Sequence, residues 1–356
     1  MPTEPDPLSP LMDFARRVVI VNAITLLFIV AALFAWANFN ALLIVFAGLL
    51  LAIFLYRLAD VLEQVLPLPH GIALALVAST LIGLFVVGVW LGAAPIEQQA
   101  DQLMRSLPTA AEAARDWINH RPALRSLLPD LPKAEQFYAR LARWLPDAGP
   151  FFTGALGVLV NLVIVIFVGI YLAAQPRPYL RALMMLVPPR RRERAWHVLD
   201  TLGKMLGRWL IGKAVSMVLV GVLTTIGLLL LDVPMALVLG LIAGLLDFIP
   251  YLGPIVASVP AVLIAFAKSP ADALYASLLF LVIHVVEGYM LVPMIERRTI
   301  ALPPAFTIVM QLLMGSIAGL AGAALATPLT AVIVVLVTML YVQDVLDVPV
   351  KPPGET

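Results

Sequence analysis

The feature that most constrains this chain is a series of apolar runs, most of them long enough to cross a membrane. Six runs approach or exceed the ~20 residues that an α-helix needs to cross ~30 Å of hydrocarbon. They are 18–37, 39–56, 71–94, 150–173, 209–231 and 273–295, and two longer runs, 234–267 and 303–343, are interrupted by proline and glycine. With 62% hydrophobic residues, 13% charged residues and a mean hydropathy of +1.00, the composition is far from that of soluble proteins. The sequence predicts an all-α polytopic membrane protein with about eight apolar segments.

Charge is distributed unevenly between the segments that connect these runs. Segment 174–208 carries eight basic and two acidic residues, whereas 95–147 carries seven of each. The positive-inside rule places 174–208 and the N-terminus in the cytoplasm, which puts 95–147 on the opposite side. Prolines such as Pro108 divide 95–147, so we expect a small insert of short amphipathic helices there.

These observations divide the chain into six parts. The predicted parts are three spans in 1–94, an extracytoplasmic helical insert in 95–149, a fourth span in 150–173, a basic cytoplasmic loop in 174–208, a transport core in 209–345 and a tail in 346–356. The first apolar run is longer than the ~7–15 residues of a signal-peptide core, so we expect it to be an uncleaved span. The absence of cysteine excludes structural disulfides and thiolate metal sites.

The two interrupted runs are the least ordinary segments. Run 234–267 would be roughly 50 Å long as one helix, which is too long for an ordinary span. Proline removes a backbone donor, so the stretch 250–254, which starts at Pro250 and ends at Pro254, predicts a corner between two half-helices. We expect a similar break in the second run at Gly315, Gly319 and Pro328. Irregular backbone survives at membrane depth only when protein buries it or when it lines a wet cavity.

Two topologies fit this pattern. The interrupted runs could form re-entrant hairpins that enter from opposite sides, as in inverted-repeat transporters, and we prefer this topology. The alternative makes each run a full crossing. A short echo between the runs, Gly-Leu-Ile-Ala-Gly-Leu at 240–245 and Gly-Ser-Ile-Ala-Gly-Leu at 315–320, matches at five of six positions and is compatible with a structural repeat. The Gly-x-x-x-Gly spacing in both also predicts close helix packing.

A few polar side chains lie inside the apolar runs, namely Asn161, Asp247, His284, Glu287 and Gln311. An ionisable group costs ~2.5–3.5 kcal/mol at the centre of a membrane helix, so such residues are functional candidates. His284 and Glu287 are three residues apart and share a helix face. Structural roles remain open: Asp247 could cap a half-helix, the His284–Glu287 pair could fix helix packing, and the amides could form interhelical hydrogen bonds.

Enzyme signatures are absent from the sequence. There is no zinc-protease His-Glu-x-x-His, no nucleophile-elbow Gly-x-Ser-x-Gly and no phosphate-binding Gly-x-x-x-x-Gly-Lys-Ser/Thr. We therefore expect no enzymatic activity, no cofactor, no metal site and no nucleic-acid partner. Without an ATPase domain, any active transport would depend on an ion gradient.

Several ordered motifs resemble the autoinducer-2 exporter family of bacterial membrane transporters. They are Asp-Phe-Ile-Pro-Tyr-Leu-Gly-Pro at 247–254, Val-Glu-Gly-Tyr-Met-Leu-Val-Pro at 286–293, Leu-Pro-Pro at 302–304 and the Gly/Ala-rich stretch 314–329. The resemblance implies a multi-pass transporter of the bacterial inner membrane that assembles into a homo-oligomeric ring, with a pentamer as the expected form. Some members of the family export a small polar quorum-sensing molecule, and others are sodium/proton antiporters.

Both lines of reasoning lead to one expected function and two alternatives. We expect a secondary transporter that exports a small polar solute similar to autoinducer-2. The first alternative is a cation/proton antiporter that uses Asp247 and Glu287, and the less favoured one is a membrane assembly protein without transport activity. The expected site for the solute or ion comprises Asp247, Pro250, Gly253, His284, Glu287 and Gln311, with structural hinges at Pro254, Gly315, Gly319 and Pro328.

Overall fold

The computed structural model describes residues 9–121, 151–291 and 302–350. It is 89% helical, and no strand occurs among these residues, so the predicted fold class is confirmed. The helices are α1 (Ser9–Ala37), α2 (Phe39–Val65), α3 (His70–Asn119), α6 (Phe151–Ala174), α7 (Pro176–Met185), η1 (Pro189–Arg191), α8 (Arg192–Leu230), α9 (Ala236–Leu246), α10 (Leu252–Lys268), α11 (Pro270–Val286), η2 (Glu287–Leu291), α13 (Pro304–Leu336) and η3 (Val337–Gln343).

The number of full-length spans is lower than the sequence predicts. Within the described residues, five helices are long and apolar enough to cross a membrane, or six if α6 and α7, which meet at 82°, count as one broken span. The expected count of about eight is not confirmed. The other apolar helical stretches, which are Val21–Ala37 within α1 and the helices α9 and α10, have at most 17 residues. This is less than the ~20 residues needed for hydrocarbon of ordinary thickness.

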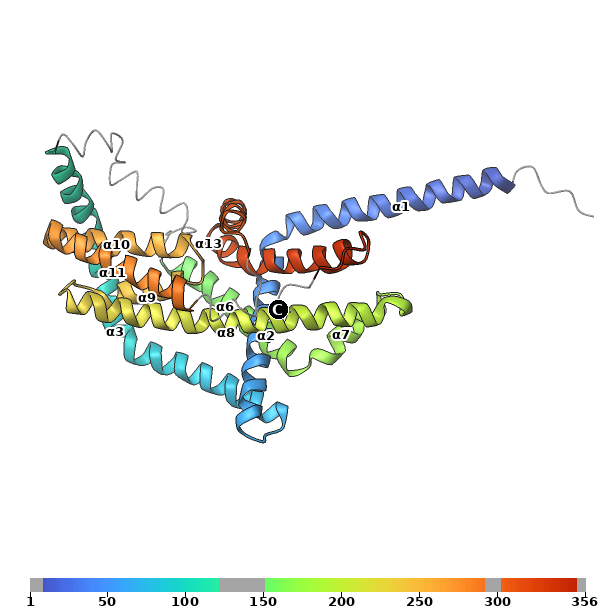
Figure 1. Cartoon of the computed structure of the whole chain (residues 1–356), viewed down its shortest axis with the longest axis horizontal. Coiled ribbons are helices and arrows are strands. Elements are labelled where there is room, and N and C mark those ends of the chain that lie inside the picture. Colours follow the sequence, from blue (N-terminus) through green and yellow to red (C-terminus); the bar gives the residue numbers. More distant parts are fainter. Residues whose placement is uncertain (1–8, 122–150, 292–301, 351–356) are drawn as a thin grey trace, which may run out of the picture.

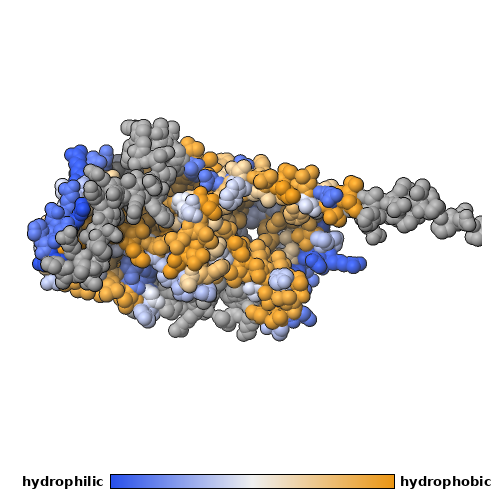
Figure 2. Space-filling view, turned by 90° about the horizontal axis from the view of Figure 1, so that it is seen from above, coloured by the Kyte–Doolittle hydropathy of each residue, from blue (hydrophilic) through white to orange (hydrophobic). Residues whose placement is uncertain are grey.

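Helices α8 to α11 lie side by side, whereas α1 extends away from the rest of the molecule (Figure 1). In the space-filling view, hydrophobic residues cover much of the central part, and hydrophilic residues gather at the left end (Figure 2). Large apolar side chains are exposed on several helices, including Phe85, Trp90 and Phe167. In water such a surface would be an aggregation hazard, whereas a lipid bilayer provides an apolar solvent for it.

The helical part of the predicted insert differs from expectation. Residues 95–119 continue α3 without interruption, and Pro95 and Pro108 both lie inside this 50-residue helix. The expectation of a chain break at Pro108 was therefore wrong. Leu103, Leu107 and Ala110 are buried in one core with α9 and α10, and this tertiary packing outweighs the cost of proline in a helix. The remainder of the insert, 122–150, lies outside the described residues.

The first interrupted run folds as a helical hairpin. Helix α9 ends at Leu246, the chain turns through 247–251 with Tyr251 at φ 65°, and α10 follows. At the open end of the hairpin, Lys268 Nζ donates hydrogen bonds to the carbonyl oxygens of Leu231 (3.3 Å) and Asp232 (3.5 Å). The two ends of run 234–267 therefore lie close to each other. This is the geometry of a hairpin and not of one continuous crossing.

Small residues allow α9 to approach α8 closely. A Cβ atom built on Gly240 would lie 1.9 Å from Thr225 Oγ1, and one on Gly244 would lie 2.7 Å from the Met217 carbonyl oxygen. The predicted role of this Gly-x-x-x-Gly stretch in close packing is confirmed. Helix α8 is consequently held against the hairpin whose corner carries Asp247.

The second interrupted run also doubles back on itself. Within α13, Ala318 and Gly319 have non-helical backbone, and Gly319 has φ 59° and ψ −144°, a region that is essentially restricted to glycine. Gln311 Nε2 donates to Thr327 Oγ1 at 3.2 Å, so residues sixteen apart meet across the two arms. Only Gly319 of the expected hinges lies at this break. Gly315 and Pro328 lie within helical arms, and Pro254 lies in the first turn of α10, after the corner.

The basic segment and the C-terminal end of the described chain are joined by one side chain. Arg194, near the start of α8, donates to the Met339 carbonyl oxygen at 2.9 Å and to Gln343 Oε1 at 2.5 Å, and it pairs with Asp344 at 3.0 Å. The segment predicted as a loop, 174–208, is largely helical, because α7 and the first part of α8 fall within it.

Candidate functional site

The site is assembled by three elements that are distant in the sequence. Helix α8 contributes Lys213, the corner after α9 contributes Asp247, and Glu287 stands where α11 passes into the π-helix η2. Lys213 Nζ lies 3.0 Å from Asp247 Oδ2 and 3.4 Å from Glu287 Oε1. One ammonium group therefore bridges two carboxylates that are forty residues apart in the chain.

Two further side chains complete the arrangement. Ser216, three residues after Lys213 on the same face of α8, donates a hydrogen bond to Glu287 Oε1 at 2.8 Å. His284 lies one turn before Glu287, and its Nδ1 is 2.7 Å from the Phe280 carbonyl oxygen. Asp247, His284 and Glu287 each offer a ligand atom within 4.8 Å of the others. The structure thus brings together the three ionisable residues that the sequence selected.

Burial makes this cluster energetically demanding. Asp247 is 1% exposed, Lys213 9% and Glu287 8%. Asp247 Oδ1 is buried and has no hydrogen-bond partner among the described residues. When all three groups are ionised, the cluster carries two negative charges and one positive charge. A buried carboxylate that is incompletely compensated is costly, so the site is suited to binding a further cation or hydrogen-bond donor.

Lys213 and Ser216 are the site residues that sequence reasoning missed. Both lie inside run 209–231, whose length and apolar character predict an ordinary span. The signal was present, because Lys213 is a charged residue five positions into an apolar run and such a residue needs a partner at membrane depth. Ser216 follows at the spacing that places it on the same helix face.

The other predicted site residues occupy different positions. Gly253 closes the corner: a Cβ atom there would lie 1.8 Å from the Leu246 carbonyl oxygen. The backbone of the corner forms hydrogen bonds within the turn. The Pro250 carbonyl oxygen accepts from Leu252 N at 2.7 Å, and that of Ile249 accepts from Gly253 N at 2.9 Å. These two carbonyls are used within the turn.

Gln311 is buried in the second hairpin, where its described hydrogen bond is to Thr327. The predicted interhelical role of its amide is therefore confirmed, here between the two arms of α13. Phe248, the residue after Asp247, packs in one apolar cluster with Met314 and Leu325 of α13. The second hairpin thus supports the corner beside the charged cluster.

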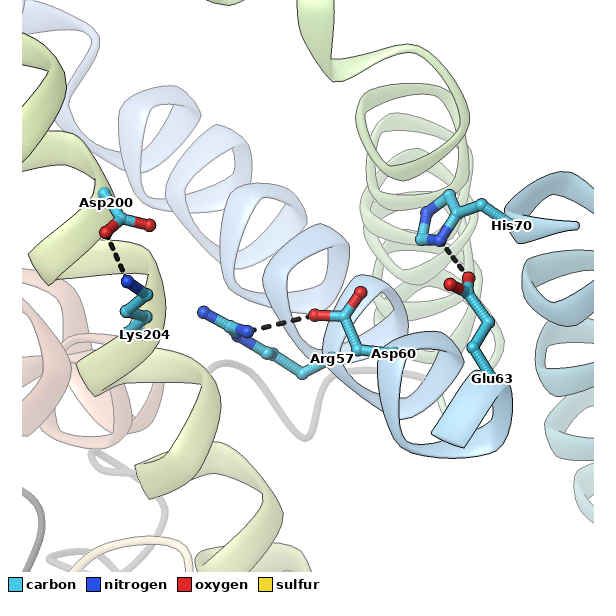
Figure 3. A network of polar contacts seen from close by, with 6 residues as sticks. All are labelled: Arg57, Asp60, Glu63, His70, Asp200 and Lys204. Carbon is cyan, nitrogen blue, oxygen red and sulfur yellow. Dashed lines mark hydrogen bonds and ion pairs between the residues drawn. The ribbon is translucent and has the colours of Figure 1, made fainter. Parts of the chain in front are cut away.

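A second polar cluster lies at the turn between α2 and α3 (Figure 3). Asp60, Glu63 and His70 offer ligand atoms within 4.8 Å of one another. Asp60 is already paired with Arg57 at 3.0 Å, and His70 Nδ1 is hydrogen-bonded to Glu63. About a third of each of the Glu63 and His70 side chains is exposed. These contacts indicate that the cluster has a structural role, in which its polar interactions stabilise the turn between α2 and α3.

The fold and the site define a class of protein: a multi-pass α-helical membrane protein with a buried charged cluster beside a broken helix. Residues 23–341 match the model of the AI-2E family transporters. The chain belongs to this family. The family is one of membrane transporters.

Three similar proteins carry names that describe transport proteins. The chain is 27% identical to YrrI of Bacillus subtilis (strain 168) over 82% of this chain and 85% of that protein, and 27% identical to YueF of the same organism. The match to YueF covers 57% of this chain and 56% of that protein, little more than half of each. This chain is also 28% identical to YhhT of Escherichia coli (strain K12), over 36% of this chain and 37% of that protein. The names of all three describe candidate transport proteins and not enzymes.

Proposed function

We propose that this protein is a secondary transporter that exchanges a monovalent cation for protons at Asp247 and Glu287. The observation that carries the proposal is the excess of buried carboxylate over buried ammonium, together with an Asp247 oxygen that has no described hydrogen-bond donor. A bound cation would neutralise that excess, and carboxylate oxygens are the ligands that hard cations prefer.

A second candidate is the export of a small polar solute such as an autoinducer-2-like molecule. This candidate is favoured by the mixed chemistry of the cluster, which places the donors Lys213 and Ser216 beside the acceptors Asp247 and Glu287. Such a set can hold the hydroxyl groups of a neutral solute from both sides. The net negative charge makes this the second choice, because an uncharged solute would leave it uncompensated.

The setting of the transporter forms part of the proposal. We place the protein in the bacterial inner membrane, with the N-terminus and 174–208 in the cytoplasm and 95–147 outside, on the strength of the charge asymmetry. We also propose a homo-oligomeric ring, a pentamer, because the family resemblance implies one. A non-transporting assembly role is disfavoured, since it would leave the buried carboxylates without a purpose.

The experiment that separates these functions is proton flux in proteoliposomes under imposed sodium, lithium or potassium gradients, reported by a pH-sensitive dye. We expect the wild type to move protons against at least one cation, and Asp247→Asn and Glu287→Gln to lose this flux. The matched control is Asp200→Asn, which removes an exposed carboxylate from the same helix as Lys213. Its flux should equal that of the wild type.

Each contrary result has a defined meaning. A wild type that moves no protons under any of these gradients would contradict the antiport proposal. In that case, efflux of hydroxylated solutes should be measured with the same variants. Loss of flux in Asp200→Asn as well would indicate that neutralising acidic residues impairs the protein generally.

A further inference from the structure

Lys213 occupies a position that a transported cation would need. Its Nζ lies 3.0 Å from Asp247 Oδ2 and 3.4 Å from Glu287 Oε1, between the two carboxylates that the proposed function uses as cation ligands. The Lys213 side chain is 11% exposed, so the ammonium is held in the cluster and does not simply extend into solvent. A positive charge that is covalently attached to α8 therefore lies beside the carboxylate oxygens that would bind the cation.

We propose that Lys213 is a tethered cation that competes with the transported cation for Asp247 and Glu287 and thereby sets the affinity of the site. This inference rests on the proposed cation transport. When no cation is bound, the ammonium neutralises one of the two buried carboxylates. When a cation enters, it displaces Nζ from the shared oxygens, and the flexible lysine stem allows the ammonium to withdraw.

The chemistry of the residues suits such a displacement. Lysine carries a compact, strongly hydrated charge on a four-carbon stem, whereas arginine would hold both carboxylates through a rigid fork. Ser216 donates to Glu287 Oε1 at 2.8 Å independently of Lys213, so one neutral donor remains in place when the ammonium leaves. Asp247 Oδ1 is buried without a described hydrogen-bond partner, so it is a further ligand atom for a cation that has reached the cluster.

A purely structural role for Lys213 predicts the opposite result. If the ammonium served only to brace α8 against the corner and α11, its removal would disorganise the carboxylates and weaken cation binding. If it competes with the cation, its removal would strengthen binding. The sign of the change in cation affinity therefore distinguishes the two roles.

The experiment is equilibrium binding of radioactive sodium ions to the purified full-length protein in lipid nanodiscs, at one pH and constant ionic strength. We expect Lys213→Gln to bind sodium at least about tenfold more tightly than the wild type, since close buried charge pairs have large coupling energies. Lys204→Gln, which removes an exposed lysine of α8 paired with Asp200, should leave the affinity unchanged. In Lys213→Ala, free ethylammonium should compete with sodium more strongly than it does in the wild type.

Unchanged or weaker sodium binding in a folded Lys213→Gln protein would overturn the inference. Should the glutamine and alanine variants fail to fold, Lys213→Arg keeps the charge, and it should bind sodium no more tightly than the wild type. Tighter binding in Lys213→Arg would also overturn the inference. A wild type that binds no sodium, lithium or potassium would instead contradict the proposed cation transport itself.

Discussion

The sharpest structural prediction concerns Gly253, at the point where α10 leaves the corner. A Cβ atom at this position would lie 1.8 Å from the Leu246 carbonyl oxygen and 2.7 Å from its carbonyl carbon. Non-bonded contacts of a Cβ atom below 3.0 Å essentially do not occur. Gly253→Ala must therefore separate the ends of α9 and α10 by more than 1 Å. The obstructing atoms belong to the backbone, so no side-chain rotation can relieve the contact.

The expected cost follows from this geometry. Overpacking of a well-packed interior usually costs about 1–3 kcal/mol, and a rigid backbone obstacle places Gly253→Ala at the upper end of this range. The same movement displaces Asp247, whose amide nitrogen would lie 3.4 Å from the new Cβ atom. We therefore expect loss of about 3 kcal/mol of stability together with weaker cation binding, because Asp247 would move relative to Lys213 and Glu287.

The assay is thermal unfolding of the purified protein in detergent, combined with sodium binding to the same samples. The matched control is Gly203→Ala in α8, where a Cβ atom would meet nothing within 4 Å. Alanine in an open helical position should stabilise the protein by up to about 1 kcal/mol. A Gly253→Ala protein with the unfolding temperature and sodium affinity of the wild type would refute the packing argument for the corner.

Two further predictions concern other parts of the fold. Thr327→Val should destabilise the protein by about 1–3 kcal/mol because the buried Gln311 amide loses its acceptor, and the double variant with Gln311→Leu should recover part of this loss in the same unfolding assay. Arg194→Ala should accelerate proteolysis after α13, because this arginine joins α8 to η3 and to Asp344, whereas Arg190→Ala should not. Equal cleavage rates in the two arginine variants would contradict the second prediction.

The sequence was sufficient to predict the class of fold, and it selected three ionisable residues, Asp247, His284 and Glu287, that the structure brings together. Apolar run lengths indicated a helical membrane protein, and the cost of Asp247 and Glu287 at membrane depth identified them before any contact was known. Proline and glycine in the interrupted runs predicted corners, and the structure has a corner in each run. The class of fold and the two corners could be predicted because each depends on a local cost that only a specific structure can offset.

The remaining features depend on tertiary contacts that local patterns do not encode. Pro108 lies inside α3 because Leu107 and Ala110 pack into the core shared with α9 and α10. Pro328 lies in a helical arm, whereas Gly319, which can adopt the required backbone angles, makes the turn. Lys213 stands out in the sequence as a charge inside an apolar run, but its pairing with Asp247 and Glu287 joins distant segments, and sequence spacing alone relates it only to Ser216.

Binding of the cargo between Asp247 and Glu287 is the central requirement of the proposed transport. The most direct measurement is anomalous X-ray scattering from crystals of the protein grown with thallium ions, which are heavy monovalent cations. We expect one strong peak in contact with Asp247 and Glu287 and close to His284, with Lys213 Nζ displaced from the two carboxylates. A thallium peak elsewhere along the transport core, with Lys213 still bridging Asp247 and Glu287, would contradict the account.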